Sequence, residues 1–158
     1  MPPSDPEANK AIIRRLYEEV WSEGKVEVVD QLFSPTTAFL SPFYPMPAVG
    51  PQPLKAFVGF LRGALPDLRF EVQSIMAEGP MVTARWHAYP THTRPFLGKE
   101  PTGDTLYFTA LEMFLIIGGR IQMIWLEMNL LSVLNQMGIA APLNLGMPGP
   151  PGGPPGAH

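Results

Sequence analysis

The sequence contains no cysteine, little charge and only three histidines. Without cysteine, disulfides, thiolate nucleophiles and thiolate metal sites are all excluded. The three histidines, His87, His92 and His158, are too few for a histidine-rich metal site. Composition alone therefore predicts a protein whose chemistry uses neither thiols nor a bound metal.

Positive charge is also scarce. Lysine and arginine number 11 against 14 aspartates and glutamates, which gives a formal net charge of -3. No stretch gathers basic side chains on one face, so the electrostatic footprint of a DNA- or RNA-binding protein is missing. The sequence has no apolar run of about 18 residues, and residues 1–10 do not resemble a secretory signal. We predict no nucleic-acid partner, no membrane partner and a cytoplasmic location.

Apolar residues and prolines are what the sequence has in abundance. Hydrophobic residues make up 46% of the chain and charged residues only 16%, a ratio that favours a large interior or a lined cavity. Residues 147–158 are nearly all proline, glycine and alanine, which cannot add to a packed core. We predict a disordered N-terminus over residues 1–8, one domain over 9–140 and a flexible Pro/Gly-rich tail over 141–158.

The hydrophobic pattern has a helical period at first and alternates after Pro66. We predict helices over residues 9–23, 26–32 and 53–65, a short strand at 36–40, an irregular loop at 41–53, strands over 68–74, 82–89, 106–117 and 120–131, a long loop at 90–103, and a last helix over 131–137. This order predicts an α+β fold, in which helices pack on one face of an antiparallel sheet.

The last two strands carry the most informative residues. If Gly118 and Gly119 form a tight hairpin turn, Glu112 lies opposite Trp125, and the side-chain period of two sets one shared face. The predicted members of that face are Phe108, Ala110, Glu112, Trp125, Glu127 and Asn129. A one-residue bulge in either strand would break this cluster.

Glu112 and Glu127 stand in otherwise apolar runs. Desolvation and mutual repulsion would raise the pKa of at least one carboxyl, the condition for a general acid or base near neutral pH. The alternative is structural: one glutamate pairs with an arginine across a dimer interface or caps a buried amide.

Other candidates lie on the preceding strand and on the first helix. Arg85, His87 and Tyr89 alternate on one strand face, and from there His87 can donate to a substrate oxygen if that face lines the cavity. In the following loop, His92 is a candidate for the pocket mouth. Tyr17 and Trp21, one helical turn apart, are candidates both for the core and for ligand contact.

Five segments together resemble a known family. They are IIRRLYEEVWSEGKVEVVDQLF (12–33), RGALPDLRF (62–70), PTHT (90–93), PTG (101–103) and WLEMNLLSVLNQMG (125–138). They are similar to the SnoaL-like polyketide cyclases of the nuclear-transport-factor-2-like superfamily, whose more distant members include ketosteroid isomerase and limonene epoxide hydrolase. The resemblance implies a cone-shaped α+β barrel or roll with the N-terminal helices on the concave face of its sheet. It also implies a homodimer without metal or organic cofactor.

The resemblance also implies an activity. These cyclases close a polyketide ester by an intramolecular aldol reaction in which an aspartate moves protons. The family's tryptophan and, four positions later, its aspartate fall on Trp125 and Asn129, so an amide replaces the acid/base group. Leu40-Ser41-Pro42 also departs from the His-Asp-Pro sequence of relatives, and Pro90 and Arg94 replace the glycines that flank the Thr-His-Thr segment.

Two hypotheses follow. In the first, the protein is an enzyme that cyclises or isomerises a polyketide-like or polycyclic substrate: Glu112 or Glu127 moves the proton, Asn129 and His87 stabilise an oxyanion, and apolar residues position the ligand. The predicted ligand contacts are Trp125, Tyr17, Trp21, Phe108, His92 and Arg85. In the second, the protein binds a small apolar ligand without catalysis. An epoxide hydrolase is a lesser alternative, because beyond Arg85 its carboxylate and arginine arrangement is not evident.

Overall fold

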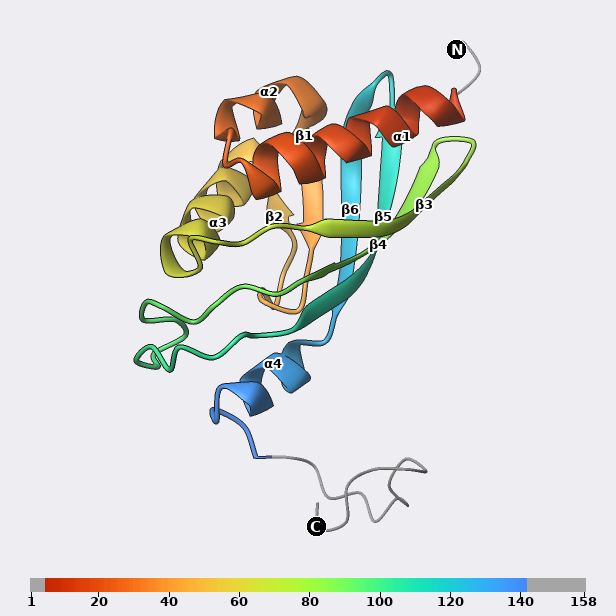
Figure 1. Ribbon diagram of the computed structural model, residues 1–158. Coiled ribbons are helices and arrows are strands. Elements are labelled where there is room, and N and C mark those ends of the chain that lie inside the picture. The colour runs from red at the N-terminus through yellow and green to blue at the C-terminus, as the bar shows by residue number, and fades with distance from the viewer. Residues whose placement is uncertain (1–4, 142–158) are drawn as a thin grey trace, which may run out of the picture.

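The computed structural model describes residues 5–141, which fold into a curved six-stranded sheet with helices on one face (Figure 1). The strands are β1 (Phe33–Leu40), β2 (Ala48–Val49), β3 (Glu71–Glu78), β4 (Met81–Ala88), β5 (Phe108–Ile117) and β6 (Arg120–Met128). The helices are α1 (Pro6–Arg15), the π-helical η1 (Leu16–Ser22), the 3-10 turn η2 (Val26–Val28), α2 (Val29–Leu32), α3 (Pro51–Ala64) and α4 (Leu130–Gln136). The predicted α+β architecture is confirmed.

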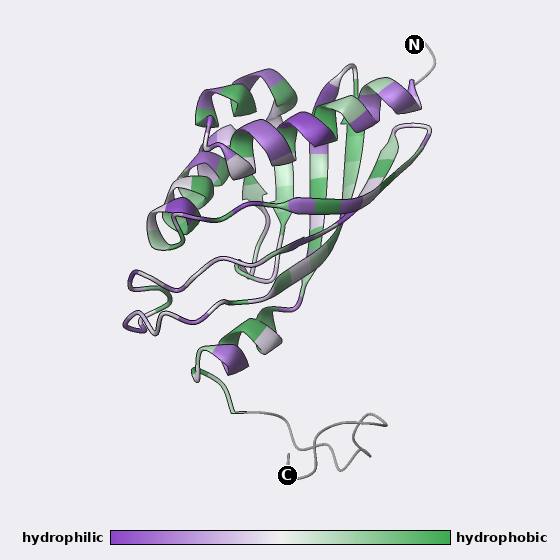
Figure 2. Cartoon of the chain, in the orientation of Figure 1, coloured by the Kyte–Doolittle hydropathy of each residue, from purple (hydrophilic) through white to green (hydrophobic). Residues whose placement is uncertain are grey.

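The strands are ordered β2-β1-β6-β5-β4-β3, and all neighbours pair antiparallel except β1 and β6, which run parallel. The parallel pair arises because the chain leaves β1 through α3 and returns to its side only after the β3–β6 meander. Helices α1, η1 and α3 cover the concave face, and their polar sides are turned outward (Figure 2). Among residues 5–141, no helix is both long and apolar enough to cross a membrane.

The first helix begins earlier than its sequence pattern predicts. Asp5 accepts hydrogen bonds from the backbone nitrogens of Glu7 (3.0 Å) and Ala8 (3.3 Å), and Pro6 stands at the first helical position. Both features start helices, because the cap satisfies free N–H groups and proline lacks one. Asp5 and residues 6–8 therefore form the cap and first turn of α1, within the stretch predicted to be disordered. The predicted Pro/Gly-rich tail lies outside the described residues, apart from Ala141.

From Leu16 the helix widens into the π-helical segment η1. The N–H of Glu23 bonds to the carbonyl of Glu18 (3.1 Å), the five-residue spacing that defines a π-helix. Its inner face buries Tyr17 and Trp21 against the sheet. Such bulges often occur at functional sites.

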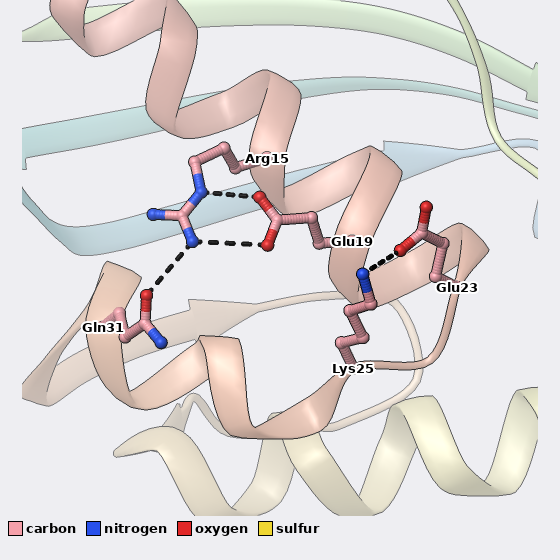
Figure 3. Close-up of polar contacts among 5 residues, drawn as sticks. All are labelled: Arg15, Glu19, Glu23, Lys25 and Gln31. Carbon is pink, nitrogen blue, oxygen red and sulfur yellow. Dashed lines mark hydrogen bonds and ion pairs between the residues drawn. The ribbon is translucent and has the colours of Figure 1, made fainter.

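Polar contacts hold the outer side of η1 (Figure 3). The guanidinium of Arg15 bonds to Glu19 (2.6 Å) and reaches Gln31 at the end of α2 (3.1 Å), and Lys25 pairs with Glu23 (2.6 Å). The bond from Arg15 to Gln31 joins the helix to α2, which helps to keep the inner face of η1 oriented toward the sheet.

Arg62 of α3 fixes the end of η1 from the other side. Its Nη1 donates to the carbonyls of Trp21 (3.1 Å), Ser22 (2.7 Å) and Leu68 (3.1 Å). Gly24 makes room for this side chain, since a Cβ there would lie 2.7 Å from Arg62 Nε, and its φ of 78° also favours glycine. The guanidinium thus ties η1 to the segment that leads into β3.

The β5–β6 hairpin departs from the predicted register. Gly118 and Gly119 both have positive φ (59° and 71°) and form the predicted turn, with Ile117 opposite Arg120. Two residues into β6 the pairing shifts, so that Gln122 has no partner on β5. This is a one-residue β-bulge, which turns all later side chains of β6 to the opposite face from the one predicted.

Candidate functional site

A cavity lies between the inner faces of η1 and α3 and the concave side of β4, β5 and β6. It holds about 450 Å³ of unfilled space, its mouth included. The aliphatic lining consists of Leu61, Leu65, Leu68, Leu126 and Met128, and the aromatic lining of Trp21, Phe43, Phe57, Phe70, Trp86 and Phe108. The one remaining lining residue is Glu112. An apolar enclosure with a single ionisable group suits a small, mostly apolar ligand.

Glu112 points inward from the middle of β5, and its residue is only 5% exposed. Its Oε2 accepts a hydrogen bond from the indole Nε1 of Trp86 (2.8 Å) and a second from the phenol of Tyr17. Its Oε1 makes no hydrogen bond with any residue between 5 and 141, so that oxygen is the one free to meet a ligand in the cavity.

Burial sets the protonation of this group. It raises the pKa of Glu112 to about 7, although the hydrogen bonds from Tyr17 and Trp86 act in the lowering direction. Burial, with the neighbouring Glu112 carboxylate, also raises the pKa of Tyr17 well above its usual value, so its phenol remains a donor. Since both donors occupy Oε2, the proton of the neutral acid sits on Oε1.

β4 presents the opposite face from the one that the sequence-based hypothesis favoured. Trp86 faces the cavity, whereas Arg85 lies exposed on the convex side of the sheet. His87 also points there, where its Nε2 bonds to Glu71 (2.7 Å) and its ring packs against Tyr89 (centroids 5.0 Å apart). The idea that the polar face of this strand lines the pocket is wrong, because apolar burial decides which face turns inward.

β6 shows the consequence of the bulge. Glu112 lies opposite Leu126, not Trp125, and Glu127 lies opposite Leu111 on the convex face. Leu126 and Met128 take the cavity positions that Trp125 and Glu127 were predicted to fill. The predicted pair of carboxylates on one face is therefore wrong, since Glu112 and Glu127 point to opposite sides of the sheet.

Asn129 follows the last residue of β6, and its side chain bonds to backbone groups. Its Oδ1 accepts from the N–H of Thr109 (2.9 Å) and its Nδ2 donates to the carbonyl of Tyr107 (3.0 Å). These bonds hold the start of β5 against the end of β6, and the residue does not line the cavity. The asparagine therefore acts as a clamp between strands in this structure.

His92 is fully buried within the loop between β4 and β5. Its backbone pairs with Asp104 (2.8 Å) and Gly103 (2.9 Å), and its Nδ1 lies 3.3 Å from the hydroxyl of Thr102. Its Nε2 has no partner among the described residues. His92 organises the loop but is not part of the cavity lining.

Four of the predicted residues do meet at one place: Glu112, Tyr17, Trp21 and Phe108. The sequence-based reasoning missed Trp86, which supplies the second donor to Glu112. A signal for it was available, because Val82, Ala84, Trp86 and Ala88 form an apolar alternation that marks the inward face of β4. Between residues 5 and 141, no three histidine, aspartate or glutamate side chains are grouped closely enough to hold a metal ion.

Comparisons with solved structures find the same fold in several bacterial proteins. A polyketide cyclase candidate from Acidithiobacillus ferrooxidans is 27% identical, with a TM-score of 0.72 over 85% of this chain and 96% of its own. IdmH, a polyketide cyclase candidate from Streptomyces antibioticus, is also 27% identical, with a TM-score of 0.72 over 82% and 98%. AclR, a hydroxylase candidate from Streptomyces galilaeus, is 25% identical, with a TM-score of 0.75 over 88% and 86%.

No match was found among curated proteins. The family pattern of the SnoaL-like polyketide cyclases matches residues 11–137, which include η1, the whole sheet and the cavity between them. This chain therefore belongs to the SnoaL-like polyketide cyclase family.

Proposed function

We propose that this protein is a cofactor-independent enzyme that uses Glu112 as its acid/base group on a neutral polyketide-like or polycyclic substrate. The observation that supports it best is the buried carboxyl whose Oε2 receives two hydrogen bonds and whose Oε1 is left to the cavity. Such a group is held in one orientation and titrates near neutral pH.

The reaction begins when ionised Glu112 removes a proton from a carbon next to a carbonyl. The C–H bond breaks, the proton moves to Oε1, and the electron pair forms an enolate. The enolate carbon then attacks a second carbonyl of the same molecule, a carbon–carbon bond forms, and the new alkoxide takes the proton back from Oε1. Isomerisation is the shorter variant, in which the proton returns to a different carbon.

The lining constrains the substrate. Among residues 5–141, Glu112 is its only charged side chain, and the donors of Tyr17 and Trp86 are already engaged with Oε2. The indole N–H of Trp21 is the lining donor that makes no hydrogen bond with residues 5–141, and one such donor favours a substrate that also delocalises its own negative charge, as a β-dicarbonyl or a ring-conjugated ketone does. A free carboxylic acid would meet the Glu112 carboxylate, which favours an ester or a ketone.

The second candidate is a binding protein without catalysis. It is favoured by Asn129, which replaces the family's acid/base aspartate and spends both polar atoms on the backbone. The epoxide hydrolase alternative loses its support, because Arg85 lies on the convex face, away from the cavity.

Proton exchange separates the enzyme from the binder without knowledge of the true substrate. We would follow deuterium incorporation into 2-tetralone, a two-ring ketone, by proton NMR. The wild type should accelerate the exchange, and Glu112→Gln should lose at least about 100-fold of that acceleration. Glu127→Gln, a carboxyl of the same strand pair on the other face, is the matched control and should keep it. Binding of 2-tetralone without acceleration in either protein would establish the binder.

We also propose that a second copy of the chain covers the convex face of the sheet. Leu111 is 50% exposed there, and Met113 of the same strand is exposed as well. In register, Leu111 is flanked by Arg85 on β4 and Glu127 on β6, neither of which has an ion pair with any residue between 5 and 141. A two-fold axis through this face would bring each arginine to the partner's Glu127.

A further inference from the structure

A second hollow adjoins the cavity and has no role in the proposed chemistry. It is formed by the loop after β1 and by the outer turn of α3, and it holds about 600 Å³ of open space. Its lining consists of Phe43, Tyr44, Ala56, Phe57 and Phe60. We call this hollow the outer groove. Among residues 5–141, no charged side chain lines it.

The outer groove adjoins the cavity. Phe43 and Phe57 line both, with ring centroids 5.1 Å apart, so these two rings are in contact and form the rim between the two hollows. On the outer side of this rim the ring of Tyr44 lies 6.2 Å from that of Phe57. Aromatic faces thus extend from the interior to the surface in one series.

Two of the aromatic rings that line the outer groove are exposed to solvent. Tyr44 is 40% exposed and Phe60 49% exposed, although large aromatic side chains gain free energy when they are buried. They come from the two segments that form the groove, Tyr44 from the loop and Phe60 from α3. Large exposed apolar side chains that gather in one hollow are typical of a ligand-binding surface.

The loop that carries Phe43 and Tyr44 is restricted by its own sequence. Residues 41–47 read Ser-Pro-Phe-Tyr-Pro-Met-Pro, so three of seven positions have a fixed φ. The hydroxyl of Ser41 also accepts from the N–H of Phe43 (3.3 Å). A loop of this kind loses little conformational freedom when a ligand binds, which is the property of a preorganised site.

We propose that the outer groove is a subsite for an uncharged aromatic ring at the far end of the ligand that Glu112 holds. The ligand is then longer than the cavity: its hydrogen-bonding oxygen reaches Glu112, its middle crosses the rim formed by Phe43 and Phe57, and its last ring packs against Tyr44 and Phe60. This inference rests on the proposed function, which places the inner end of the ligand at Glu112. It adds that the site selects ligands by their length.

Two probes of different length test the subsite. They are 2-naphthol and 6-phenyl-2-naphthol, which carry the same hydroxyl at one end and differ by one ring at the other. Dissociation constants follow from quenching of tryptophan fluorescence, since Trp21 and Trp86 line the cavity. At pH 8 the longer probe should bind the wild type about tenfold more tightly.

The variants locate the extra ring. Tyr44→Ala and Phe60→Ala should each weaken the longer probe at least fivefold and the shorter one less than twofold. Met46→Ala, in the same loop, 76% exposed and outside both linings, is the matched control and should change neither. Circular dichroism melts of each variant establish that the fold is retained.

The outcomes separate the two proposals. If both probes bind the wild type equally, or if Tyr44→Ala and Phe60→Ala weaken both probes alike, the subsite is overturned. If the longer probe depends on Tyr44 and Phe60 but Glu112→Gln leaves both affinities unchanged, the subsite stands and the role of Glu112 fails. Absence of binding by either probe overturns both.

Discussion

The phenol of Tyr17 and the carboxyl of Glu112 are hydrogen-bonded beside the cavity, although they lie 95 positions apart in the sequence. The indole of Trp86 bonds to the same carboxyl oxygen, Oε2. Together they fix the orientation of the carboxyl and leave Oε1 as the oxygen that gains and loses the proton. The acidity of Glu112 is therefore a balance between burial, which raises its pKa, and two donors, which lower it.

Replacing Glu112 by glutamine should stabilise the protein at alkaline pH. The carboxyl has an ordinary pKa of 4.5 in the unfolded chain and about 7 in the folded one. Between these values the folded state keeps a proton that the unfolded state has released, so the wild type loses roughly 3 kcal/mol as the pH rises. Glutamine accepts the same hydrogen bonds and does not titrate.

Urea unfolding of both proteins at pH 5 and pH 8 measures this effect. The difference in free energy of unfolding should move in favour of Glu112→Gln by most of that amount between the two pH values. An identical pH dependence of the two proteins would mean that Glu112 does not titrate in this range.

Replacing Tyr17 by phenylalanine should raise the pKa of Glu112 above 7. The ionised carboxylate loses one of its two donors, while the ring keeps its contact with Phe70 (centroids 6.1 Å apart). A hydrogen bond to a charged group is worth enough to move the pKa by roughly one to two units. Carbon-13 NMR of the Glu112 carboxyl against pH gives the value directly, with Tyr89→Phe as the control on the opposite face. An unchanged midpoint would show that the phenol does not stabilise the carboxylate.

Restoring the family's aspartate at position 129 should weaken the fold and create no activity. Asp cannot donate to the carbonyl of Tyr107, so one hydrogen bond becomes a repulsive contact and stability falls by about 1 kcal/mol. No acceleration of 2-tetralone exchange beyond that of the wild type is expected, because residue 129 does not line the cavity. Asn129→Ala separates the lost bonds from the added charge. A gain of activity would show that the side chain reaches the ligand.

Hydrophobic periodicity predicted most of the elements and their order, but it missed β2 (Ala48–Val49), which lies in the stretch predicted to be an irregular loop. The helices over α1, η1 and α3, the β3–β6 meander and its turn at Gly118 and Gly119 all agree with the pattern of apolar residues. These features are local, because each depends on neighbours within one helical turn or one hairpin. The resemblance to a family supplied what local patterns do not, the packing of the helices on the concave face.

The site was only half predictable, and one residue explains most of the wrong predictions. Gln122 forms a bulge in β6 that no feature of the sequence indicates, and the bulge turns the side chains from Trp125 to Glu127 to the opposite face of the sheet from the one predicted. The face of β4 was a separate error. The alternation of Val82, Ala84, Trp86 and Ala88 marks its inward side, because apolar burial and not the position of His87 decides which side turns inward.

A charge exchange tests the proposed dimer. In a two-fold interface each Arg85 faces the partner's Glu127, so Arg85→Glu places two like charges together at both ends of the interface. Glu127→Arg does the same with the opposite sign. Each single variant should lower the association constant, and sedimentation equilibrium measures it.

The double variant decides the geometry. Arg85→Glu combined with Glu127→Arg restores opposite charges only if these two positions meet across the axis, so it should recover most of the wild-type association. Arg14→Glu, an exposed charge reversal on α1 at the other side of the sheet, is the control for a general effect of altered charge. Recovery by the double variant would fix which residues face each other. A wild type that sediments as a monomer, or a double variant as weak as the singles, would remove this pairing and leave Leu111 to another partner.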